Sequence, residues 1–249
     1  MRNTVHYNLV PGTRFDHIAI GVRALTDAAP VLAGVLGGVP DQGRPSGGFR
    51  WGTWRYANGG SLEAIEPLGA DGFLHRFLAQ RGPGIHHVTF KVVSIEAACA
   101  RARARGYEIV GRDDSDPCWK EAFLHPRQAL GIVVQLAEAH PYPAPPPSEP
   151  PPGAAGAPPA LAVLGLRLSA RSRERAHAQW GAVLEGELER ERARELVYRW
   201  GDSPMRVSVE VDPARAEGPL AIEVAGARTP ALPPGSHPAL GTVFVYRSA

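Results

Sequence analysis

The sequence predicts an α+β fold in which tandem βαβββ modules form a curved mixed sheet around a cavity. Three observations lead to this class. A strand, a helix and three strands follow one another twice within residues 14–138, matching segments recur at a constant spacing, and a partial third copy follows a proline-rich tract. The chain is therefore expected to contain two complete modules, followed by a second and degenerate pair of modules.

In the first module, alternating apolar residues predict a strand over 14–22. A helix follows, and Gly37 and Gly38 are expected to end it. Asn58-Gly59-Gly60 is typical of a hairpin turn. Three short strands are expected near 49–52, 53–57 and 61–66.

The second module begins after a short connecting helix, which apolar residues at helical spacing predict over 71–80. Its first strand covers 85–92. Alternation in this strand places His87 on the face that corresponds to that of His17 in the first module, and His86 on the opposite face, in the layer that faces the helix. A helix to Gly106 and three strands near 107–111, 120–125 and 131–137 complete the second module.

Three polar residues are candidate N-caps of the module helices. Asp27, Ser94 and Ser172 each precede a run of apolar residues at helical spacing, and each side chain can accept a hydrogen bond from a free backbone N–H of the first turn.

The proline-rich tract 139–159 contains ten prolines and is predicted to be an extended linker. It separates a domain over 14–138 from a degenerate, truncated domain over 160–249. Strands are expected in that domain near 161–168, 195–200 and 205–211, and remnants of a fourth module near 219–225 and 241–246.

Composition excludes several classes of protein. The 249 residues carry a net charge of +2, which gives little reason to expect nucleic acid as a partner. No apolar stretch approaches the length of a membrane span, and the first residues contain no apolar core of a secretory signal. Two cysteines do not form a disulfide framework. We expect a cytoplasmic protein with a small-molecule substrate and no membrane partner, and a homodimer is one possible assembly.

Candidate ligands to a metal ion recur with the modules. The distance along the chain from His17 to His87 is nearly the same as that from Glu63 to Gln135. Each copy thus supplies one imidazole and one oxygen donor, which suits a single divalent ion such as Zn, Co, Ni, Mn or Fe at a pseudo-twofold axis. The cavity is therefore predicted to be metal-centred. The alternative is a degenerate site that no longer binds an ion.

The third copy lacks this pattern. Gly165 and Arg167 stand where a His is expected, and Val209 aligns with Glu63. We therefore expect no metal site in the C-terminal part.

Other side chains are candidates for the pocket wall. Lys91 shares the cavity face of its strand with His87 and can meet an anionic group, and His125 either lines the pocket or caps a turn. Trp51 and Trp54 are better explained by packing, and His86 by a structural role.

Several segments of residues 14–138 resemble the vicinal oxygen chelate superfamily, which is built from paired βαβββ modules around a metal ion. Within it, the segments are most similar to methylmalonyl-CoA epimerases. They are Phe15-Asp16-His17-Ile18-Ala19, Leu62-Glu63-Ala64-Ile65-Glu66-Pro67-Leu68, Gly84-Ile85-His86-His87-Val88 and Phe123-Leu124-His125-Pro126.

The resemblance implies that His17, Glu63, His87 and Gln135 are the metal ligands. Gln135 departs from the epimerase pattern, because the family has a carboxylate at that position and the carboxylate is a proposed base. A second acid of some members has no counterpart in residues 49–54. Glu63 is then the one carboxylate of the ligand set, and we expect it to be the catalytic base.

Three interpretations remain open. The first is a metal-dependent epimerase, isomerase or lyase that moves a proton next to a chelated carbonyl of a small acid or acyl thioester. The second is an Fe(II)-dependent extradiol-type dioxygenase, because two His and one carboxylate also suit such iron. The third is a non-catalytic protein that binds a small molecule in the cavity, as resistance proteins of the superfamily do.

Overall fold

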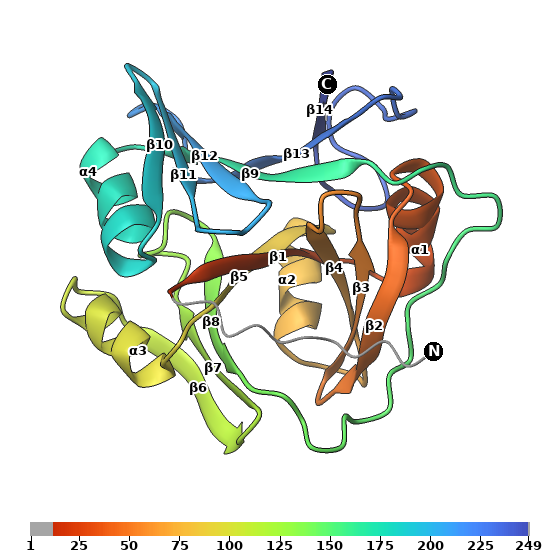
Figure 1. Cartoon of the computed structure of the whole chain (residues 1–249), viewed down its shortest axis with the longest axis horizontal. Coiled ribbons are helices and arrows are strands. Elements are labelled where there is room, and N and C mark those ends of the chain that lie inside the picture. Colours follow the sequence, from red (N-terminus) through yellow and green to blue (C-terminus); the bar gives the residue numbers. More distant parts are fainter. Residues whose placement is uncertain (1–11, 249) are drawn as a thin grey trace.

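The computed structural model describes residues 12–248, which form two β-sheets flanked by short helices (Figure 1). The larger sheet has eight strands in the order β2-β3-β4-β1-β5-β8-β7-β6, and the smaller sheet has six in the order β10-β11-β12-β9-β13-β14. The larger sheet curls strongly, and each sheet matches one pair of modules. The predicted α+β class with paired βαβββ modules is confirmed.

The strands and helices alternate along the chain as the modules require. In the larger sheet the strands are β1 (Arg14–Gly21), β2 (Val39–Ser46), β3 (Phe49–Arg55), β4 (Ser61–Pro67), β5 (Gly84–Lys91), β6 (Ile109–Asp116), β7 (Trp119–Leu124) and β8 (Val133–Ala139). In the smaller sheet they are β9 (Ala162–Ala170), β10 (Glu187–Arg192), β11 (Glu195–Arg199), β12 (Arg206–Val211), β13 (Gly218–Gly226) and β14 (Phe244–Ser248). The helices are α1 (Leu25–Ala29), α2 (Phe73–Arg81), α3 (Ile95–Arg103) and α4 (Arg173–Ala176), and α1 and α4 continue into the π-helical turns η1 (Pro30–Val35) and η2 (His177–Val183).

The pseudo-twofold axis lies between β1 and β5. These two strands pair antiparallel at the centre of the larger sheet, and each pairs in parallel with the last strand of its own module, β1 with β4 and β5 with β8. All four candidate ligands stand on these four central strands. The two copies of the duplicated sequence thus meet along their first strands, β1 and β5.

Two strands of the structure were not predicted, and both are edge strands. β2 contains Pro40, Gly43 and Pro45, and β10 consists mostly of charged residues. Proline and charge discourage pairing with another chain, so they are common at the edges of sheets and obscure the alternation that marks a buried strand. The two predicted strands at 49–52 and 53–57 are also wrong, because β3 runs through both without interruption.

The predicted N-caps are confirmed at two of three positions. Ser94 Oγ accepts a hydrogen bond from the Ala97 N–H at 3.2 Å, and Ser172 Oγ accepts one from the Arg175 N–H at 3.3 Å. Asp27 does not cap its helix, because α1 begins at Leu25 and Asp27 lies in its first turn. An acidic residue there still favours the positive end of the helix dipole.

In each module, a glutamate from the last strand accepts a hydrogen bond from the first backbone N–H of the helix. Glu66 Oε2 accepts a hydrogen bond from the Leu25 N–H at 2.6 Å, and Glu138 Oε2 accepts one from the Ile95 N–H at 2.8 Å. The two glutamates follow Glu63 and Gln135 at the same offset, so they too are related by the repeat. The same contact thus docks each helix on its sheet.

The proline-rich tract is extended, as predicted, and it packs against the molecule. Past the end of β8 it runs beside β2 toward α1 (Figure 1). The Glu149 N–H donates to the Gly43 carbonyl at 2.7 Å, and Trp54 Nε1 donates to the Pro152 carbonyl at 3.2 Å. At Gly52, a Cβ atom would lie only 2.6 Å from the Pro151 side chain. The tract therefore covers the edge of the larger sheet as a strap.

The C-terminal part packs on the N-terminal part through aromatic side chains. Phe15 and Phe90 stack with ring centroids 4.8 Å apart, and Trp200 contacts both of them at 5.8 and 4.8 Å. Trp180 completes the group at 6.3 Å from Trp200. One continuous hydrophobic core contains residues of both sheets. We propose on this basis that 14–138 and 160–249 fold as one unit.

The sequence predicts neither a secretory signal nor a membrane span. The first residues of the chain, for which the sequence predicts no secretory signal, lie outside the described residues 12–248. Among those described residues, no helix combines the length and the apolar character needed to span a bilayer.

Replacing Trp200 tests the shared core. Trp200→Ala should lower the free energy of unfolding by about 3–5 kcal/mol, because it removes a fully buried aromatic side chain. Urea unfolding followed by circular dichroism should remain a single transition at lower midpoint. Leu188→Ala, at a side chain 42% exposed, is the control. Two separate transitions, with only the later one unchanged, would show that the halves fold independently.

Replacing Glu138 tests the docking of α3. Burial by itself raises the pKa of Glu138, but hydrogen bonds from Lys120, Ile95 and His140 bring it from 4.5 to about 2. A depressed pKa contributes stability above the unfolded value, and this stability is lost as pH falls from about 4.5 to about 2. Glu138→Gln should therefore lower the urea midpoint near neutral pH and converge with the wild type near pH 2. Glu108→Gln, at an exposed position, should change neither.

Candidate metal centre

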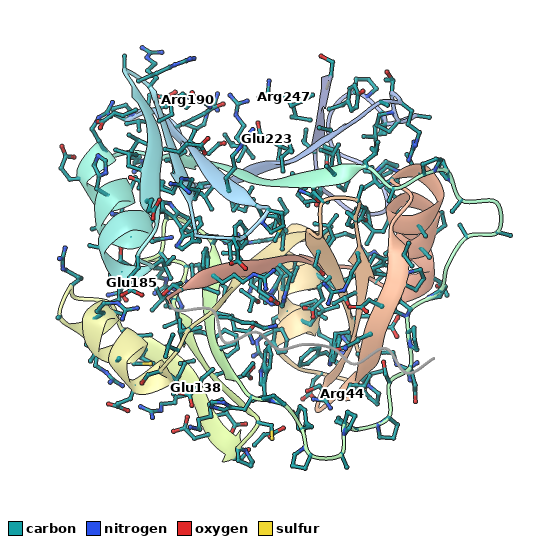
Figure 2. All side chains as sticks on the ribbon, in the orientation of Figure 1. Arg44, Glu138, Glu185, Arg190, Glu223 and Arg247 are labelled. Atoms are coloured by element: carbon teal, nitrogen blue, oxygen red, sulfur yellow. The ribbon has the colours of Figure 1, made fainter. Side chains whose placement is uncertain are left out.

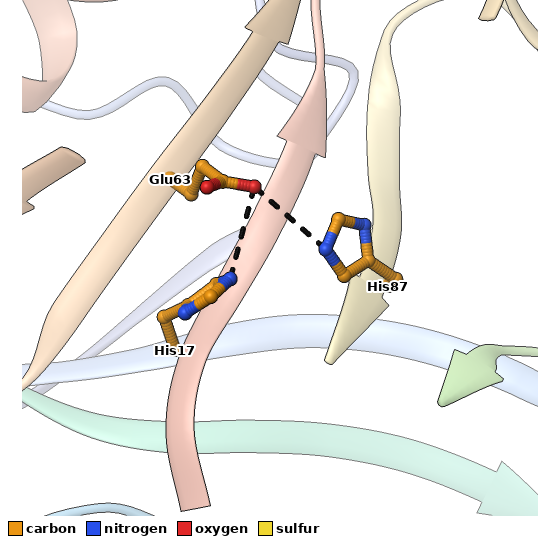
Figure 3. A group of neighbouring side chains, drawn as sticks. All are labelled: His17, Glu63 and His87. Carbon is orange, nitrogen blue, oxygen red and sulfur yellow. Dashed lines mark ion pairs between the residues drawn. The ribbon is translucent and has the colours of Figure 1, made fainter. Parts of the chain in front are cut away.

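Three predicted ligands meet at the centre of the larger sheet (Figure 3). The Nε2 atoms of His17 and His87 each lie 3.7 Å from Glu63 Oε1, and the ligand atoms of the three residues lie within 4.8 Å of one another. All three side chains are buried. Within residues 12–248 this is the one group of three or more such side chains with that spacing.

The fourth predicted ligand, Gln135, reaches the same centre through Thr89. Thr89 Oγ1 donates to Gln135 Oε1 at 2.6 Å and lies 2.9 Å from His17 Nε2. Thr89 is fully buried and pairs in register with both His17 and Gln135. The amide oxygen of Gln135 therefore faces the histidines.

A further residue, Glu121 on β7, orients this amide. Gln135 Nε2 donates to Glu121 Oε2 at 2.7 Å, and Trp119 Nε1 donates to the same oxygen at 3.0 Å. An amide nitrogen can only donate to a carboxylate, so this bond turns the Gln135 oxygen toward the centre. Within residues 12–248 no donor reaches Glu121 Oε1. Sequence analysis missed Glu121, because the register of the β7–β8 hairpin decides which side chain lies beside Gln135.

Each histidine is also held through its Nδ1 atom. Asp16 Oδ2 lies 2.9 Å from His17 Nδ1, and Asp16 Oδ1 lies 2.9 Å from Lys91 Nζ. His86 Nδ1 lies 2.9 Å from His87 Nδ1. Both Nε2 atoms therefore point toward Glu63.

Burial and charge shift the pKa values of these groups strongly. Burial raises the pKa of Glu63 to about 7, with Asp16 and Glu121 adding to the rise and His17 opposing it. Burial lowers the pKa of His87, with His86 and His17 contributing. Burial also works to lower the pKa of His17, but the carboxylates of Glu63 and Asp16 raise it overall.

The partner of His17 has the opposite shift. Burial works to raise the pKa of Asp16, yet the charge of Lys91 and the hydrogen bond with His17 hold it well below its ordinary value. Asp16 is therefore an anion that supports its histidine. Lys91 thus pairs with an anionic group of the protein itself, and its role toward a substrate stays a prediction.

These residues fit a divalent metal ion. Two imidazoles and one carboxylate converge in a buried position, the Gln135 amide oxygen lies next to them on Thr89, and such a donor set suits the borderline metals. Without an ion, the site concentrates a carboxylate and two histidines in a place where burial disfavours their charges. His17, Glu63, His87 and Gln135 would hold the ion.

The centre opens into a cleft of about 2000 Å³. Lys91 and His125 both line it. His125 Nδ1 also accepts a hydrogen bond from the Arg127 N–H at 3.2 Å, so this residue both lines the pocket and caps a turn. Trp51 lines the cleft, whereas Trp54 is fully buried and serves packing. Pro145, Pro146, Pro147 and Ser148 of the strap contribute part of the wall.

The smaller sheet holds ion pairs in place of metal-type ligands. Glu223, only 3% exposed, pairs with Arg247 at 2.7 Å and lies 4.0 Å from Arg167 (Figure 2). Arg167 also pairs with Glu210. The arginine predicted in place of a histidine thus neutralises buried and half-buried carboxylates within its own sheet.

Comparison with known proteins identifies the family. Residues 16–123 match the Glyoxalase/Bleomycin resistance protein/Dioxygenase superfamily. The chain is 31% identical over 136 residues to the ethylmalonyl-CoA/methylmalonyl-CoA epimerase of Cereibacter sphaeroides. The matched region covers 50% of this chain and 97% of the epimerase. It is also 31% identical over 134 residues to the uncharacterized protein YqjC of Bacillus subtilis, over 50% of this chain and 91% of YqjC.

A solved structure extends the similarity of fold to most of the chain. A mutant of 4-hydroxymandelate synthase from Streptomyces coelicolor superimposes with a TM-score of 0.61 over 87% of this chain and 72% of the synthase, at 14% identity. The chain belongs to the glyoxalase, bleomycin resistance protein and dioxygenase superfamily.

Metal titration tests the centre. Added Co²⁺ or Zn²⁺ should bind with a stoichiometry of about one ion per chain, and His87→Ala should weaken binding at least about 100-fold because one ligand of four is lost. Isothermal titration with a competing chelator measures this. His237→Ala, a histidine of the C-terminal half, is the control. Unchanged affinity in His87→Ala would place the ion elsewhere.

Proposed function

We propose that this protein is a metal-dependent isomerase, most simply an epimerase, that moves a proton at the carbon next to the carbonyl of an acyl thioester. The observation that carries the proposal is the pair of carboxylates on the wall of one cleft, Glu63 beside the histidines and Glu121 beside Gln135. The other observations concern the metal ion, the two proton carriers and the size of the cleft.

The reaction first needs a group that makes the proton on the carbon next to the carbonyl more acidic. A divalent ion bound by His17, Glu63, His87 and Gln135 supplies Lewis acidity toward a carbonyl oxygen and so lowers the cost of removing the neighbouring proton. The protein's own contribution is to bring these four donors together in a buried place.

Glu63 is the first proton carrier. In the absence of an ion, burial and the charges of Asp16 and Glu121 raise its pKa to about 7. A carboxylate that also held the ion would be a weak base until substrate loosened that bond, so its role as general base is tied to substrate entry. Its Oε1 atom faces both histidines, and the residue lines the cleft. Glu63 therefore stands where a carbon next to a chelated carbonyl would be placed.

Glu121 is the second proton carrier. It belongs to β7, and β1, β5 and β8 separate it from Glu63 on β4 in the curled sheet. Both carboxylates line the same cleft. Inversion at carbon needs a proton donor on the face opposite the base. Sequence analysis expected Glu63 as the one carboxylate of the ligand set and did not identify Glu121.

The cleft favours a substrate with a long arm. Its volume of about 2000 Å³ is roughly twice the upper end of ordinary small-molecule pockets. Arg14, Arg76 and Arg81 line it, and none of them forms an ion pair among the described residues. A phosphate-bearing thioester such as a coenzyme A ester would fill this space and meet these cations, in keeping with the names of the epimerase relatives.

The second candidate function is that of an iron-dependent dioxygenase. His17, His87 and Glu63 form by themselves a set of two histidines and one carboxylate, which suits Fe(II) with open positions for substrate and oxygen. Gln135 Oε1 lies beside Thr89, and this position favours a fourth protein ligand. A fourth protein ligand would leave fewer positions on the iron open for substrate and oxygen. A non-catalytic binding protein would need neither carboxylate.

A deuterium exchange experiment tests the proposed reaction. The metal-loaded protein should exchange the C2 proton of methylmalonyl-CoA with solvent deuterium and racemise it. Glu63→Gln and Glu121→Gln should each lower racemisation by roughly two orders of magnitude or more, the usual effect of removing a general acid or base. Each variant should still exchange one enantiomer, because the remaining carboxylate serves one face.

The outcomes separate the candidates. Racemisation that survives in either variant would exclude that carboxylate as a proton carrier. Absence of exchange together with oxygen uptake on a catechol by the Fe(II)-loaded protein would support the dioxygenase. Binding of methylmalonyl-CoA without exchange or oxygen uptake would support the binding protein. Glu189→Gln, at an exposed position of β10, should behave as the wild type.

A further inference from the structure

Two β-bulges interrupt the central pair of strands. In the β1–β5 ladder, Phe15 pairs with Phe90 and His17 with Thr89, so Asp16 has no partner opposite it. Farther along the ladder, Ala19 pairs with His87 and Ile20 with Ile85, so His86 has no partner. Asp16 and His86 directly precede His17 and His87, the two histidines that the repeat matches with each other. The bulges are therefore related by the pseudo-twofold axis.

A bulge changes the face on which side chains lie. In a regular strand, neighbouring side chains point to opposite faces, whereas the two residues of a bulge oppose a single partner and point to one side. Asp16 and His17 both line the cleft, and so do His86 and His87. The alternation that placed His86 on the opposite face is wrong for this reason.

Each bulged residue reaches the Nδ1 atom of the histidine that follows it. Asp16 Oδ2 lies 2.9 Å from His17 Nδ1, and His86 Nδ1 lies 2.9 Å from His87 Nδ1. Aspartate can only accept there, so His17 carries a proton on Nδ1. The one hydroxyl proton of Thr89 goes to Gln135 Oε1, so without an ion His17 Nε2 donates to Thr89 Oγ1, and a bound ion would take the place of that Nε2 proton. Between two Nδ1 atoms there is room for one proton. A histidine that binds an ion through Nε2 carries its proton on Nδ1, so His87 donates and His86 accepts.

The two partners are themselves fixed. Lys91 Nζ holds the second oxygen of Asp16 at 2.9 Å. The ring of His86 packs against Phe73 and Phe77 of α2, with ring centroids at 5.4 and 4.8 Å. A carboxylate thus supports one ligand and a neutral imidazole supports the other.

We propose that Asp16 and His86 are positioning residues of the metal centre, and that the paired bulges place them so that His17 and His87 carry their protons on Nδ1 and present Nε2 to the ion. This inference rests on the proposed metal-dependent function. The inference explains why both histidines are oriented as they are. It also predicts that the two histidines differ in strength as metal ligands. Asp16 makes His17 the stronger donor, because an anion supports the N–H of the ring more than a neutral acceptor does.

Substitution of each partner tests the proposal through metal affinity. Asp16→Ala and His86→Ala should each weaken Co²⁺ binding about 10- to 100-fold, the usual effect of losing such a partner. Asp16→Asn and His86→Asn keep an acceptor oxygen close to the position of the lost one, and should recover most of the affinity. The visible absorption of bound Co²⁺ should change in the alanine variants and return toward that of the wild type in the asparagine variants.

A second readout does not depend on the metal. Long-range ¹H–¹⁵N correlation spectra of the metal-free protein report which ring nitrogen carries the proton. Wild-type His87 should carry it on Nδ1, and His86→Ala should move it toward Nε2. Equal tautomers in the two proteins, or alanine variants that bind Co²⁺ like the wild type, would overturn the proposal. If wild-type protein bound no Co²⁺ at all, the proposed function would fail, while the tautomers would still decide the role of His86.

Thermal unfolding separates positioning from general damage. Asp27→Asn, on the exposed surface of α1, is the matched control and should keep wild-type affinity. An alanine variant that loses affinity should retain a folded circular dichroism spectrum. Loss of affinity that the asparagine variants do not recover would show that the partners act through packing alone, which contradicts the proposal.

Discussion

The antiparallel pairing of β1 with β5 is the constraint on which the rest of the structure depends. It joins the two modules at a pseudo-twofold axis and sets β4 and β8 on either side. The four candidate ligands stand on these strands, so any change in this ladder would move all of them relative to one another. The outer strands, the helices and the strap then close the cleft around the centre. The same ladder carries the two bulges that turn Asp16 and His86 toward their histidines.

The centre concentrates ionisable groups where burial works against their charges. Glu63, His17 and His87 are all buried, and isolated charges in such a place cost several kcal/mol each. Hydrogen bonds at every Nδ1 atom and at the Gln135 amide reduce this cost and hold the donors in position. A divalent ion would supply the missing positive charge. The proposed chemistry uses the same feature, because burial raises the pKa of Glu63, and a carboxylate with a raised pKa can both take and return a proton.

The C-terminal half has kept the module fold and lost the ligands. Its sheet covers the aromatic side chains Phe15 and Phe90, which the curled sheet presents away from the cleft, and ion pairs such as Arg247–Glu223 satisfy its own buried charge. The strap joins the halves and contributes prolines to the wall of the cleft. The second half thus supports the first by burying apolar surface, a role that needs only the overall fold.

The sequence by itself determined the module order and the central strands, and it predicted the candidate ligands His17, Glu63, His87 and Gln135, because local alternation and an internal repeat are visible in the chain alone. Only the tertiary structure revealed β2 and β10, since edge strands carry proline and charge in place of an apolar pattern. It alone showed that Asp16, His86 and Glu121 reach the centre. The face on which a side chain lies depends on bulges and strand register, and these are decided by partner strands that are distant along the chain.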